Sequence, residues 1–166
     1  IGIIGLGSVG KELAKKALAL GMNVCCFDLY KDKKFLSQFN EVVFTENIND
    51  IYEKSDIISL HIPHTHKTDK LISREILFSK MKRNPIIINT SRGKLVDTDF
   101  LIKAIEEGQV KGYLTDVLAE EPISKDEKLV GIKNVIITPH VGSRTFQSVE
   151  RQGSKAILNL IQAISI

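Results

Sequence analysis

The hydrophobic residues of this chain occur alternately in short continuous runs and in longer stretches with helical spacing. Continuous apolar runs are typical of strands that are covered on both faces. Strands that alternate with helices predict an α/β fold with a parallel sheet. The predicted strands cover residues 1–4, 22–28, 41–44, 56–63, 84–90, 112–117 and 134–140.

Five stretches between or after these runs carry apolar residues three or four positions apart, which predicts helices. A lysine-rich stretch containing Lys31, Lys33 and Lys34 lacks this spacing and is interpreted as a solvated loop. The predicted helices run from Val9 to a cap at Gly21, over 47–54, from an N-cap at Ser73 through Met81, from an N-cap at Asp97 to Gly108, and from Arg144 to Ile164.

This order of elements predicts a doubly wound sheet with strand order 3-2-1-4-5-6 at its centre and helices on both faces. The last predicted helix carries an apolar stripe that is longer than one sheet face covers. We therefore expect part of the stripe to be exposed, or buried against another chain. The stripe consists of Val149, Ala156, Ile157, Leu160, Ile161 and Ile164.

Composition narrows the range of functions. The chain has 166 residues, the size of one domain, and its 43% hydrophobic and 26% charged residues are ordinary for a globular protein. A net charge of +3 is too small to argue for a nucleic-acid partner, and no apolar run approaches the roughly 20 residues of a membrane helix. Cys25 and Cys26 are adjacent on a predicted strand and point to opposite faces, so we interpret them as reduced cysteines of a cytoplasmic protein.

The sequence GLGSVG at positions 5–10 follows a predicted strand and opens a predicted helix, which is the pattern of a dinucleotide-binding turn. Gly5 permits the tight turn, and Gly7 lets the backbone approach a pyrophosphate. Gly10 lets the helix pack close to the sheet. The alternative is a glycine-rich turn of an α/β fold that holds no ligand, and the flanking strand and helix argue against it.

An acidic residue completes this pattern. Asp28 stands at the end of the second predicted strand, about twenty residues after the turn, as a dinucleotide site requires. Its carboxylate would accept hydrogen bonds from the adenosine ribose and repel a 2′-phosphate, which favours NAD over NADP. The amides of Ser8 and Val9 would meet the phosphates at the positive end of the helix.

Four charged or titratable residues follow buried strands and are therefore expected at the same edge of the sheet: Arg92, Asp116, Glu121 and His140. An arginine can hold a substrate carboxylate through two parallel hydrogen bonds. A histidine can donate a proton to a carbonyl oxygen as hydride reaches the carbon, and a neighbouring carboxylate favours its charged form. This combination suits the reduction of a 2-keto acid.

The chain resembles the cofactor domain of the NAD-dependent D-isomer-specific 2-hydroxyacid dehydrogenases, a family that includes dehydrogenases of D-lactate, glycerate and 3-phosphoglycerate. The resemblance runs nearly end to end and rests on GLGSVG, FD at Asp28, SLHIP, INTSRGKLVD, DVLAEEP and TPHVGS, in this order. It implies an NAD(P)-binding Rossmann fold and an oxidoreductase that transfers a hydride between NAD(H) and a D-2-hydroxy acid or 2-keto acid.

The resemblance also implies roles for individual residues. The catalytic arginine, glutamate and histidine of the family fall on Arg92, Glu121 and His140, and Asp116 matches a carboxylate that binds the nicotinamide carboxamide. Further positions that match the cofactor lining are Ile62, Thr90, Ser91, Val141, Gly142 and Ser143.

Two departures from the family pattern stand out. His64 and His66 occupy positions where an apolar residue and a proline are usual. We interpret them as solvated histidines with no cysteine or carboxylate partner nearby, and we predict no metal site. The second departure is length: we expect residues 1–166 to form the dinucleotide-binding domain and the substrate-binding domain to lie outside this chain.

Two other functions are compatible with parts of the pattern. An NAD(H)-sensing corepressor of the same family would keep the same arginine, glutamate and histidine, and its partner-binding segments would lie outside the chain. Formate dehydrogenase resembles the family but carries glutamine where this chain has Glu121. The dehydrogenase is favoured, with a small 2-hydroxy or 2-keto acid as substrate and a homodimer as the expected assembly of the full-length protein.

Overall fold

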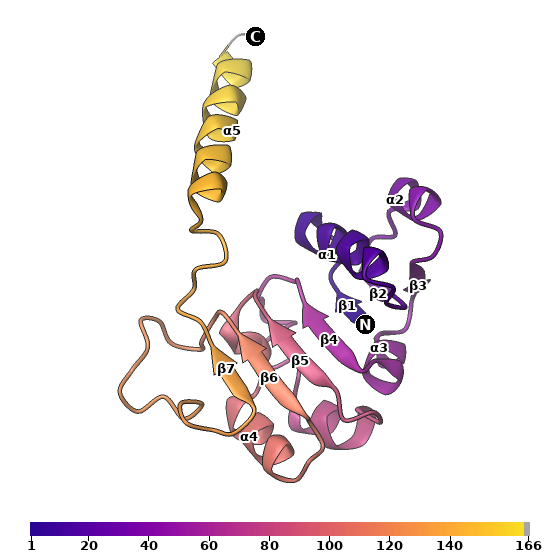
Figure 1. Ribbon diagram of the computed structural model, residues 1–166, viewed down its shortest axis with the longest axis vertical. Helices are drawn as coiled ribbons and strands as arrows, with labels where there is room; N and C mark the ends of the chain where they lie inside the picture. The colour runs from indigo at the N-terminus through magenta and orange to yellow at the C-terminus, as the bar shows by residue number, and fades with distance from the viewer. Residues whose placement is uncertain (165–166) are drawn as a thin grey trace.

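A computed structural model describes residues 1–164 of the chain, so the last two residues of the predicted domain lie outside it. Seven parallel strands form one sheet in the order β3-β2-β1-β4-β5-β6-β7 (Figure 1). The predicted doubly wound α/β fold and its central strand order are confirmed, and β7 extends the sheet by one strand. The strands are β1 (Gly2–Ile4), β2 (Cys25–Phe27), β3 (Val43–Thr45), β4 (Ile57–Leu60), β5 (Ile86–Asn89), β6 (Gly112–Thr115) and β7 (Val135–Ile137).

Two groups of helices cover the two faces of the sheet. Successive strand residues point to opposite faces and therefore pack against different groups. Ile3 packs in a cluster with residues of α1 and α2, whereas Ile4 belongs to the larger cluster that includes residues of α3 and α4. The helices are α1 (Ser8–Ala19), α2 (Lys33–Gln38), α3 (Ile48–Lys54), the π-helix η1 (Ile76–Lys80), the 3-10 helix η2 (Gly93–Leu95), α4 (Thr98–Glu106) and α5 (Phe146–Ile164).

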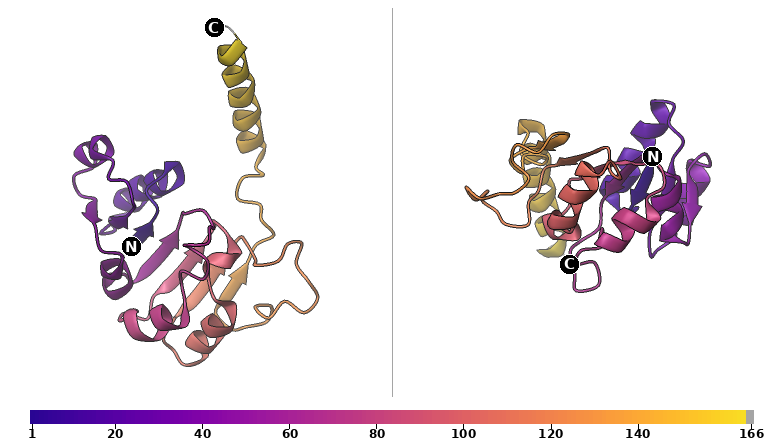
Figure 2. Two further views of the ribbon diagram at one scale, coloured as in Figure 1. Left: turned by 180° about the vertical axis from the view of Figure 1, so that it is seen from behind. Right: turned by 90° about the horizontal axis from the view of Figure 1, so that it is seen from below.

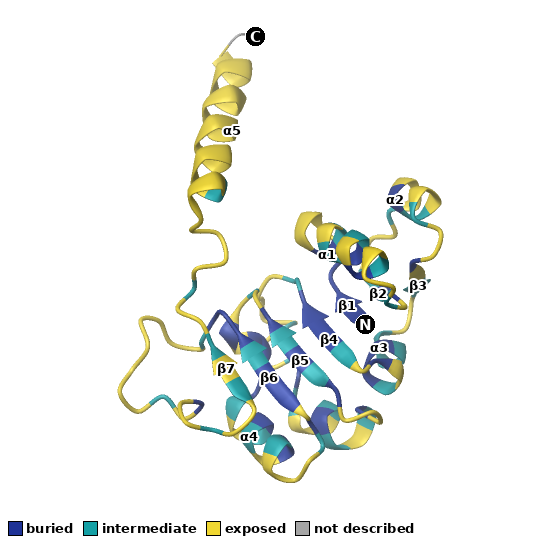
Figure 3. Ribbon diagram, viewed as in Figure 1, coloured by how far each residue is buried: buried dark blue, intermediate teal, exposed yellow. Residues whose placement is uncertain are grey.

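The α1 face of the sheet is left open toward β7. Strand register aligns Ile88, Leu114 and Ile136 in one row across β5, β6 and β7 on this face. Ile88 and Leu114 are half-buried, and Ile136 at the edge is 59% exposed (Figure 3). A row of apolar side chains on a sheet normally packs against another layer. The helices within residues 1–164 therefore leave this apolar row of the sheet uncovered.

The last helix extends away from the sheet. None of the described residues of α5 is buried, and the helix projects from the body of the domain in Figure 1 and in the left view of Figure 2. Val149 is 60% exposed and Leu160 is 62% exposed. The expectation of an exposed apolar stripe is confirmed. Among the described residues, no helix has the length and apolar content that a bilayer span requires.

One predicted loop is wrong. Residues 33–38 form α2, because the Asp32 carboxylate accepts a hydrogen bond from the Phe35 amide at 2.9 Å and Phe35 is buried. The helix was not predicted because the lysines around it made this short segment resemble a solvated loop. Lys31 is also more than a solvated residue, since its ammonium lies 5.1 Å from the ring centre of Phe44.

Two predicted helix caps differ in detail. The helix after β4 contains the π-helix η1, and no hydrogen bond from the Ser73 side chain caps it in the described structure. Asp97 is the N-cap residue of α4, but its carboxylate pairs with the Lys70 ammonium at 3.0 Å and does not accept a helix amide. A long-range ion pair has replaced the local hydrogen bond that the sequence predicted.

The two cysteines are free, as expected. Cys26 is fully buried, and burial, followed by the neighbouring Cys25 thiol, raises its pKa to about 12. Cys25 is half-buried, and burial raises its pKa as well. Both side chains therefore behave as small apolar groups of the sheet at neutral pH.

Tyr52 of α3 supplies a stability prediction. Its hydroxyl is buried without a hydrogen-bond partner among the described residues, and burial raises its pKa. A buried, unpaired hydroxyl costs free energy, so Tyr52→Phe should raise the free energy of unfolding by roughly 1 kcal/mol in chemical denaturation. Tyr113→Phe is the matched control, because the Tyr113 hydroxyl accepts a hydrogen bond from Asn89 at 3.1 Å. That variant should be less stable than the parent, and equal effects of the two changes would refute the argument.

Candidate functional site

The glycine turn after β1 is shaped by two close backbone approaches. Gly5 has φ +101°, and a Cβ there would lie 2.5 Å from the His61 carbonyl oxygen. A Cβ on Gly10 would lie 2.0 Å from the Gly5 carbonyl oxygen. Only glycine fits at these two positions, and as a result the start of α1 lies directly against the ends of β1 and β4.

The same turn leaves room and hydrogen-bond donors for an anion. Gly7 is the N-cap residue of α1 without a side-chain cap, and a Cβ there would meet no atom within 4 Å. The amides of Ser8 and Val9 lie in the first helical turn, where the helix itself supplies no acceptor. The positive end of the α1 dipole adds to them, so the turn fits a pyrophosphate.

Asp28 is held beside this turn by two backbone amides. Its carboxylate accepts hydrogen bonds from Leu6 at 2.6 Å and from Tyr30 at 3.0 Å, one on each oxygen. Each carboxylate oxygen has two lone pairs, so both keep one acceptor position. Asp28 can therefore bind two ribose hydroxyls while it fixes the second residue of the glycine turn.

The loop after β4 lies next to the glycine turn. The Ile62 carbonyl accepts a hydrogen bond from the Ser91 hydroxyl, which ties this loop to the turn after β5. His64 differs from the sequence prediction, because its Nε2 pairs with the Asp69 carboxylate at 2.7 Å. The partner was missed because it lies five residues further along a turn. His66 is exposed, and no group of three potential metal ligands forms within residues 1–164.

Arg92 follows β5 on a turn that a buried asparagine holds. The Asn89 amide donates to the Arg92 carbonyl at 2.9 Å and accepts from the Ser91 amide at 3.1 Å. The Arg92 side chain is exposed, and its Nη1 donates to the Ser91 carbonyl at 2.6 Å. Thr90 is exposed on the same turn.

Asp116 follows β6 and holds the turn after β7. Its carboxylate accepts hydrogen bonds from the Thr138 hydroxyl, from the Val141 amide at 3.0 Å and from the Gly142 amide at 2.8 Å. Burial opposes ionisation of Asp116, but these three donors outweigh it and lower its pKa. The two amides lie directly after His140, so the carboxylate fixes the backbone that carries this histidine.

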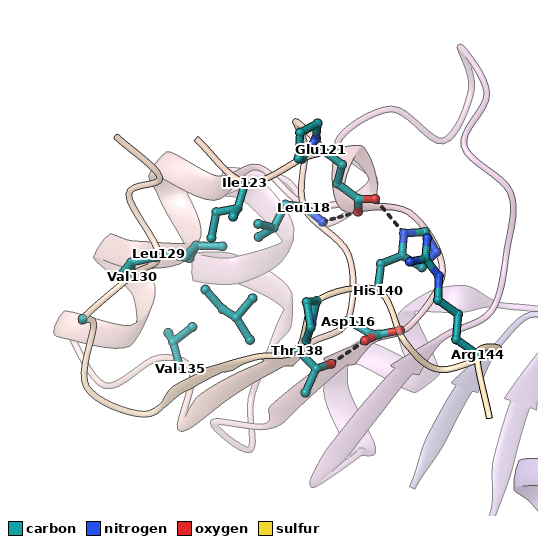
Figure 4. A pocket seen from close by; sticks show the side chains of 14 residues that line it. Asp116, Leu118, Glu121, Ile123, Leu129, Val130, Val135, Thr138, His140 and Arg144 are labelled. Atoms are coloured by element: carbon teal, nitrogen blue, oxygen red, sulfur yellow. Dashed lines mark hydrogen bonds and ion pairs between the residues drawn. The ribbon is translucent and has the colours of Figure 1, made fainter. Parts of the chain in front are cut away.

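The Glu121 carboxylate and the His140 imidazole are hydrogen-bonded at the rim of a pocket (Figure 4). Glu121 Oε2 lies 2.6 Å from His140 Nδ1, and its Oε1 accepts a hydrogen bond from the Leu118 amide at 2.9 Å. The hydrogen bond with His140, then that from Leu118, lowers the pKa of Glu121. Glu121 is therefore a carboxylate at neutral pH, and the other ring nitrogen of His140 remains available for chemistry.

The pocket has a volume of about 780 Å³ and is lined by charged groups at one end and apolar groups at the other. Asp116, Glu121 and His140 share its charged end with Arg144, whereas Leu129 and Val135 lie at the apolar end (Figure 4). Arg92 does not line this pocket. The structure thus brings three of the four predicted residues together and places Arg92 on the adjacent strand end.

Three residues that hold the site were missed in the sequence. Asn89 and Thr138 are polar residues that end or follow continuous apolar strands, and this position is the signal that could have identified them. The Leu118 amide gave no signal in the sequence, because every residue except proline carries a backbone N–H. Thr138 and Asn89 also bind residues more than twenty positions away, Asp116 and Tyr113, and periodicity does not report such contacts.

Residues 1–142 match the family described as D-isomer specific 2-hydroxyacid dehydrogenase, NAD binding domain. The chain belongs to this family. The predicted Rossmann fold and NAD as cofactor are confirmed for this 2-hydroxyacid dehydrogenase domain, and the glycine turn and Asp28 fit a dinucleotide as described above.

Known relatives of this dehydrogenase domain are about twice as long or longer. It is 39% identical to D-3-phosphoglycerate dehydrogenase of Methanocaldococcus jannaschii over 154 residues, which cover 93% of this chain and 29% of that protein. It is 35% identical to glyoxylate reductase of Thermofilum pendens over 164 residues, 99% of this chain and 48% of that protein.

A solved structure extends the similarity to the whole domain. The NAD-complexed form of a D-isomer specific 2-hydroxyacid dehydrogenase from Lactobacillus delbrueckii ssp. bulgaricus is 28% identical, with a TM-score of 0.86. The similarity covers 99% of this chain and 52% of that one. The chain therefore spans 29% of one of these relatives and about half of the other two.

The Asp116 hydrogen bonds generate a pH prediction. A carboxylate whose pKa is lowered by folding stabilises the protein above its unfolded pKa of about 3.9, and this contribution is lost as pH falls through the folded value. Asp116→Asn keeps the shape but loses one acceptor oxygen. Its melting temperature should lie below that of the parent at pH 7, and the difference should shrink at pH 3.

The control is Asp126→Asn, at an exposed aspartate of the loop that follows Glu121. It should leave the melting temperature unchanged at both pH values. A difference for Asp116→Asn that is equally large at pH 3 and pH 7 would show that the charge of Asp116 does not stabilise the turn.

Proposed function

We propose that the full-length protein is an NAD-dependent oxidoreductase that interconverts a D-2-hydroxy acid and the corresponding 2-keto acid. The observation that carries the proposal is the 2.6 Å pair between Glu121 and His140. It lies at the same edge of the sheet as the glycine turn and the turn of Arg92, since all these segments follow parallel strands. A proton donor, a carboxylate-binding arginine and a dinucleotide site thus share one edge.

Each residue has a defined task in reduction of the keto acid. Arg92 binds the substrate carboxylate through its guanidinium and orients the carbonyl. His140 donates a proton to the carbonyl oxygen, and Glu121 stabilises the imidazolium from which this proton comes. NADH held by the glycine turn and Asp28 would supply the hydride to the carbonyl carbon and would be oxidised to NAD⁺. Proton and hydride together convert the carbonyl to a hydroxyl group.

The cofactor contacts are proposed along the carboxyl edge of the sheet. Each oxygen of the Asp116 carboxylate can accept two hydrogen bonds. Thr138 and Val141 both donate to Oδ1, whereas Gly142 alone donates to Oδ2. Oδ2 therefore keeps one acceptor position for a carboxamide. The proposed contact residues are Gly5, Gly7, Ser8, Val9, Gly10, Asp28, Ile62, Thr90, Ser91, Arg92, Asp116, His140, Val141, Gly142 and Ser143.

The rest of the polypeptide is proposed to form a substrate-binding domain that closes over this edge. Arg92 is exposed and His140 lies on an open rim, whereas hydride transfer benefits from the exclusion of water. The relatives carry about as much chain again as this domain. The exposed stripe of α5 is available to pack against that additional domain.

The assembly is proposed to be a homodimer in the cytoplasm. The open apolar row that ends at Ile136 offers a surface for a second copy. The two free cysteines are consistent with a reducing compartment. A full-length protein that sediments as a monomer at micromolar concentration would contradict the dimer.

The alternatives gain no support. The relatives described above are dehydrogenases and reductases, and none of them is a corepressor. Glu121 pairs with His140 as a carboxylate, which differs from the glutamine of formate dehydrogenase.

The direct test is a screen of the full-length protein with NADH and the keto acids glyoxylate, hydroxypyruvate and pyruvate. Relatives are named as reductases of glyoxylate and hydroxypyruvate, so these two are the first choices. Loss of NADH absorbance that requires a keto acid supports the proposal. No turnover with any 2-keto acid would reject it.

Asp28 predicts the cofactor preference. The parent should bind NADH at least about tenfold more tightly than NADPH, because a 2′-phosphate would meet the Asp28 carboxylate. Asp28→Ser removes the charge and should shrink this ratio. Fluorescence titration of the full-length protein with both cofactors measures it. Lys34→Ala, an exposed change on α2, should leave the ratio unchanged, and tighter NADPH binding by the parent would overturn the assignment.

Glu121 predicts the pH dependence of reduction. Glu121→Gln keeps a hydrogen bond to His140 but removes the negative charge that favours imidazolium. Reduction needs the proton on His140. As pH rises, the full-length variant should therefore lose activity at a lower pH than the parent does. His140→Ala should lose most activity at every pH while NADH binding persists. If the pH profile of reduction is the same for Glu121→Gln and the parent, Glu121 only stabilises the turn and does not act on the protonation of His140.

A further inference from the structure

Asn89 is a fully buried polar side chain whose hydrogen bonds converge on one turn. Its amide nitrogen donates to the Arg92 carbonyl at 2.9 Å and to the Tyr113 hydroxyl at 3.1 Å. Its amide oxygen accepts from the Ser91 amide at 3.1 Å. The side chain is 0% exposed, so it contacts neither solvent nor substrate. Its bonds therefore act on the backbone of Ser91 and Arg92.

The backbone of Asn89 reaches the neighbouring strand end. Its carbonyl accepts hydrogen bonds from the Asp116 amide at 3.0 Å and from the Thr115 hydroxyl at 3.1 Å. Asp116 in turn binds the two amides that follow His140. A continuous set of buried and partly buried hydrogen bonds thus joins the turn of Arg92 to the turn of His140.

We infer that Asn89 is a positioning residue for Arg92 and, through Asp116, keeps Arg92 at a fixed spacing from His140. The inference rests on the proposed function, because it assigns to Arg92 the substrate carboxylate. The guanidinium of Arg92 is exposed, and its one hydrogen bond within the described residues is to the adjacent Ser91 carbonyl. Its direction therefore depends on the backbone that Asn89 holds.

The chemistry of the amide explains why asparagine stands here. The Arg92 carbonyl can only accept and the Ser91 amide can only donate, so the side chain must donate and accept at once. Aspartate has the same shape but offers no donor when ionised. Serine offers one small hydroxyl that cannot reach both partners. Asn89→Asp and Asn89→Ser thus break the same contacts in different ways.

The experiment uses the full-length protein with NADH and the keto acid that it reduces, glyoxylate first. In both Asn89 variants KM for glyoxylate should rise at least about tenfold, which is a larger factor than the rise in the dissociation constant of NADH. Asn84→Asp is the matched control. The Asn84 amide also donates to a carbonyl, that of Gly108 at 2.6 Å, but at the opposite end of β5. This control should leave KM unchanged.

A double-mutant cycle separates positioning from general destabilisation. If Asn89 acts through Arg92, then adding Asn89→Ser to Arg92→Lys should change KM for glyoxylate less than twofold. Additive effects, or a KM that stays at the parent value in both Asn89 variants, would overturn the inference. Melting temperatures identify a variant that does not fold, and the cycle is then measured with the other substitution.

A further readout keeps the inference distinct from the proposed function. Amide hydrogen exchange of the segment containing Ser91 should accelerate in Asn89→Ser and stay unchanged in Asn84→Asp. Unchanged protection in Asn89→Ser would refute the positioning role. Absence of keto-acid turnover in the parent would instead reject the proposed function, and hydrogen exchange would still decide whether Asn89 holds this turn.

Discussion

Parallel hydrogen bonding from β1 outward is the constraint on which the remaining features depend. It sends the carboxyl ends of all seven strands to one edge, so residues far apart in sequence follow neighbouring strands there. The glycine turn, Asp28, Arg92, Asp116 and His140 share an edge for this reason. No local interaction among them would assemble such a site without the sheet.

A second requirement acts at the strand ends, where polar side chains are buried. A buried amide, hydroxyl or carboxylate without partners destabilises a protein, and Asn89, Thr115 and Asp116 each find several. Their partners belong mainly to the turns that follow the strands. Satisfying the buried groups therefore also fixes the turns, and the precision of the edge comes from the same hydrogen bonds that the fold requires.

The sequence predicted features that depend on local pattern. Strand runs, the central strand order and the glycine turn follow from periodicity and from the conformations that glycine permits. The helix α2 was missed because its apolar contribution is small beside three lysines. Asn89 was missed because its role depends on complete burial and on a contact with Tyr113, 24 residues away, and a local pattern reports neither. The roles of Arg92, Glu121 and His140 remain predictions, although the structure brings Glu121 and His140 into contact.

The exposed α5 and the open row along β7 affect how this domain behaves in solution. Each of these two surfaces presents apolar side chains to water, and one molecule carries both surfaces. Copies of the domain separated from the rest of the polypeptide can then adhere to one another in more than one orientation. Such association strengthens with concentration and, near room temperature, with mild warming, because apolar attraction weakens on cooling. The same exposed surfaces therefore make the separate domain prone to self-association.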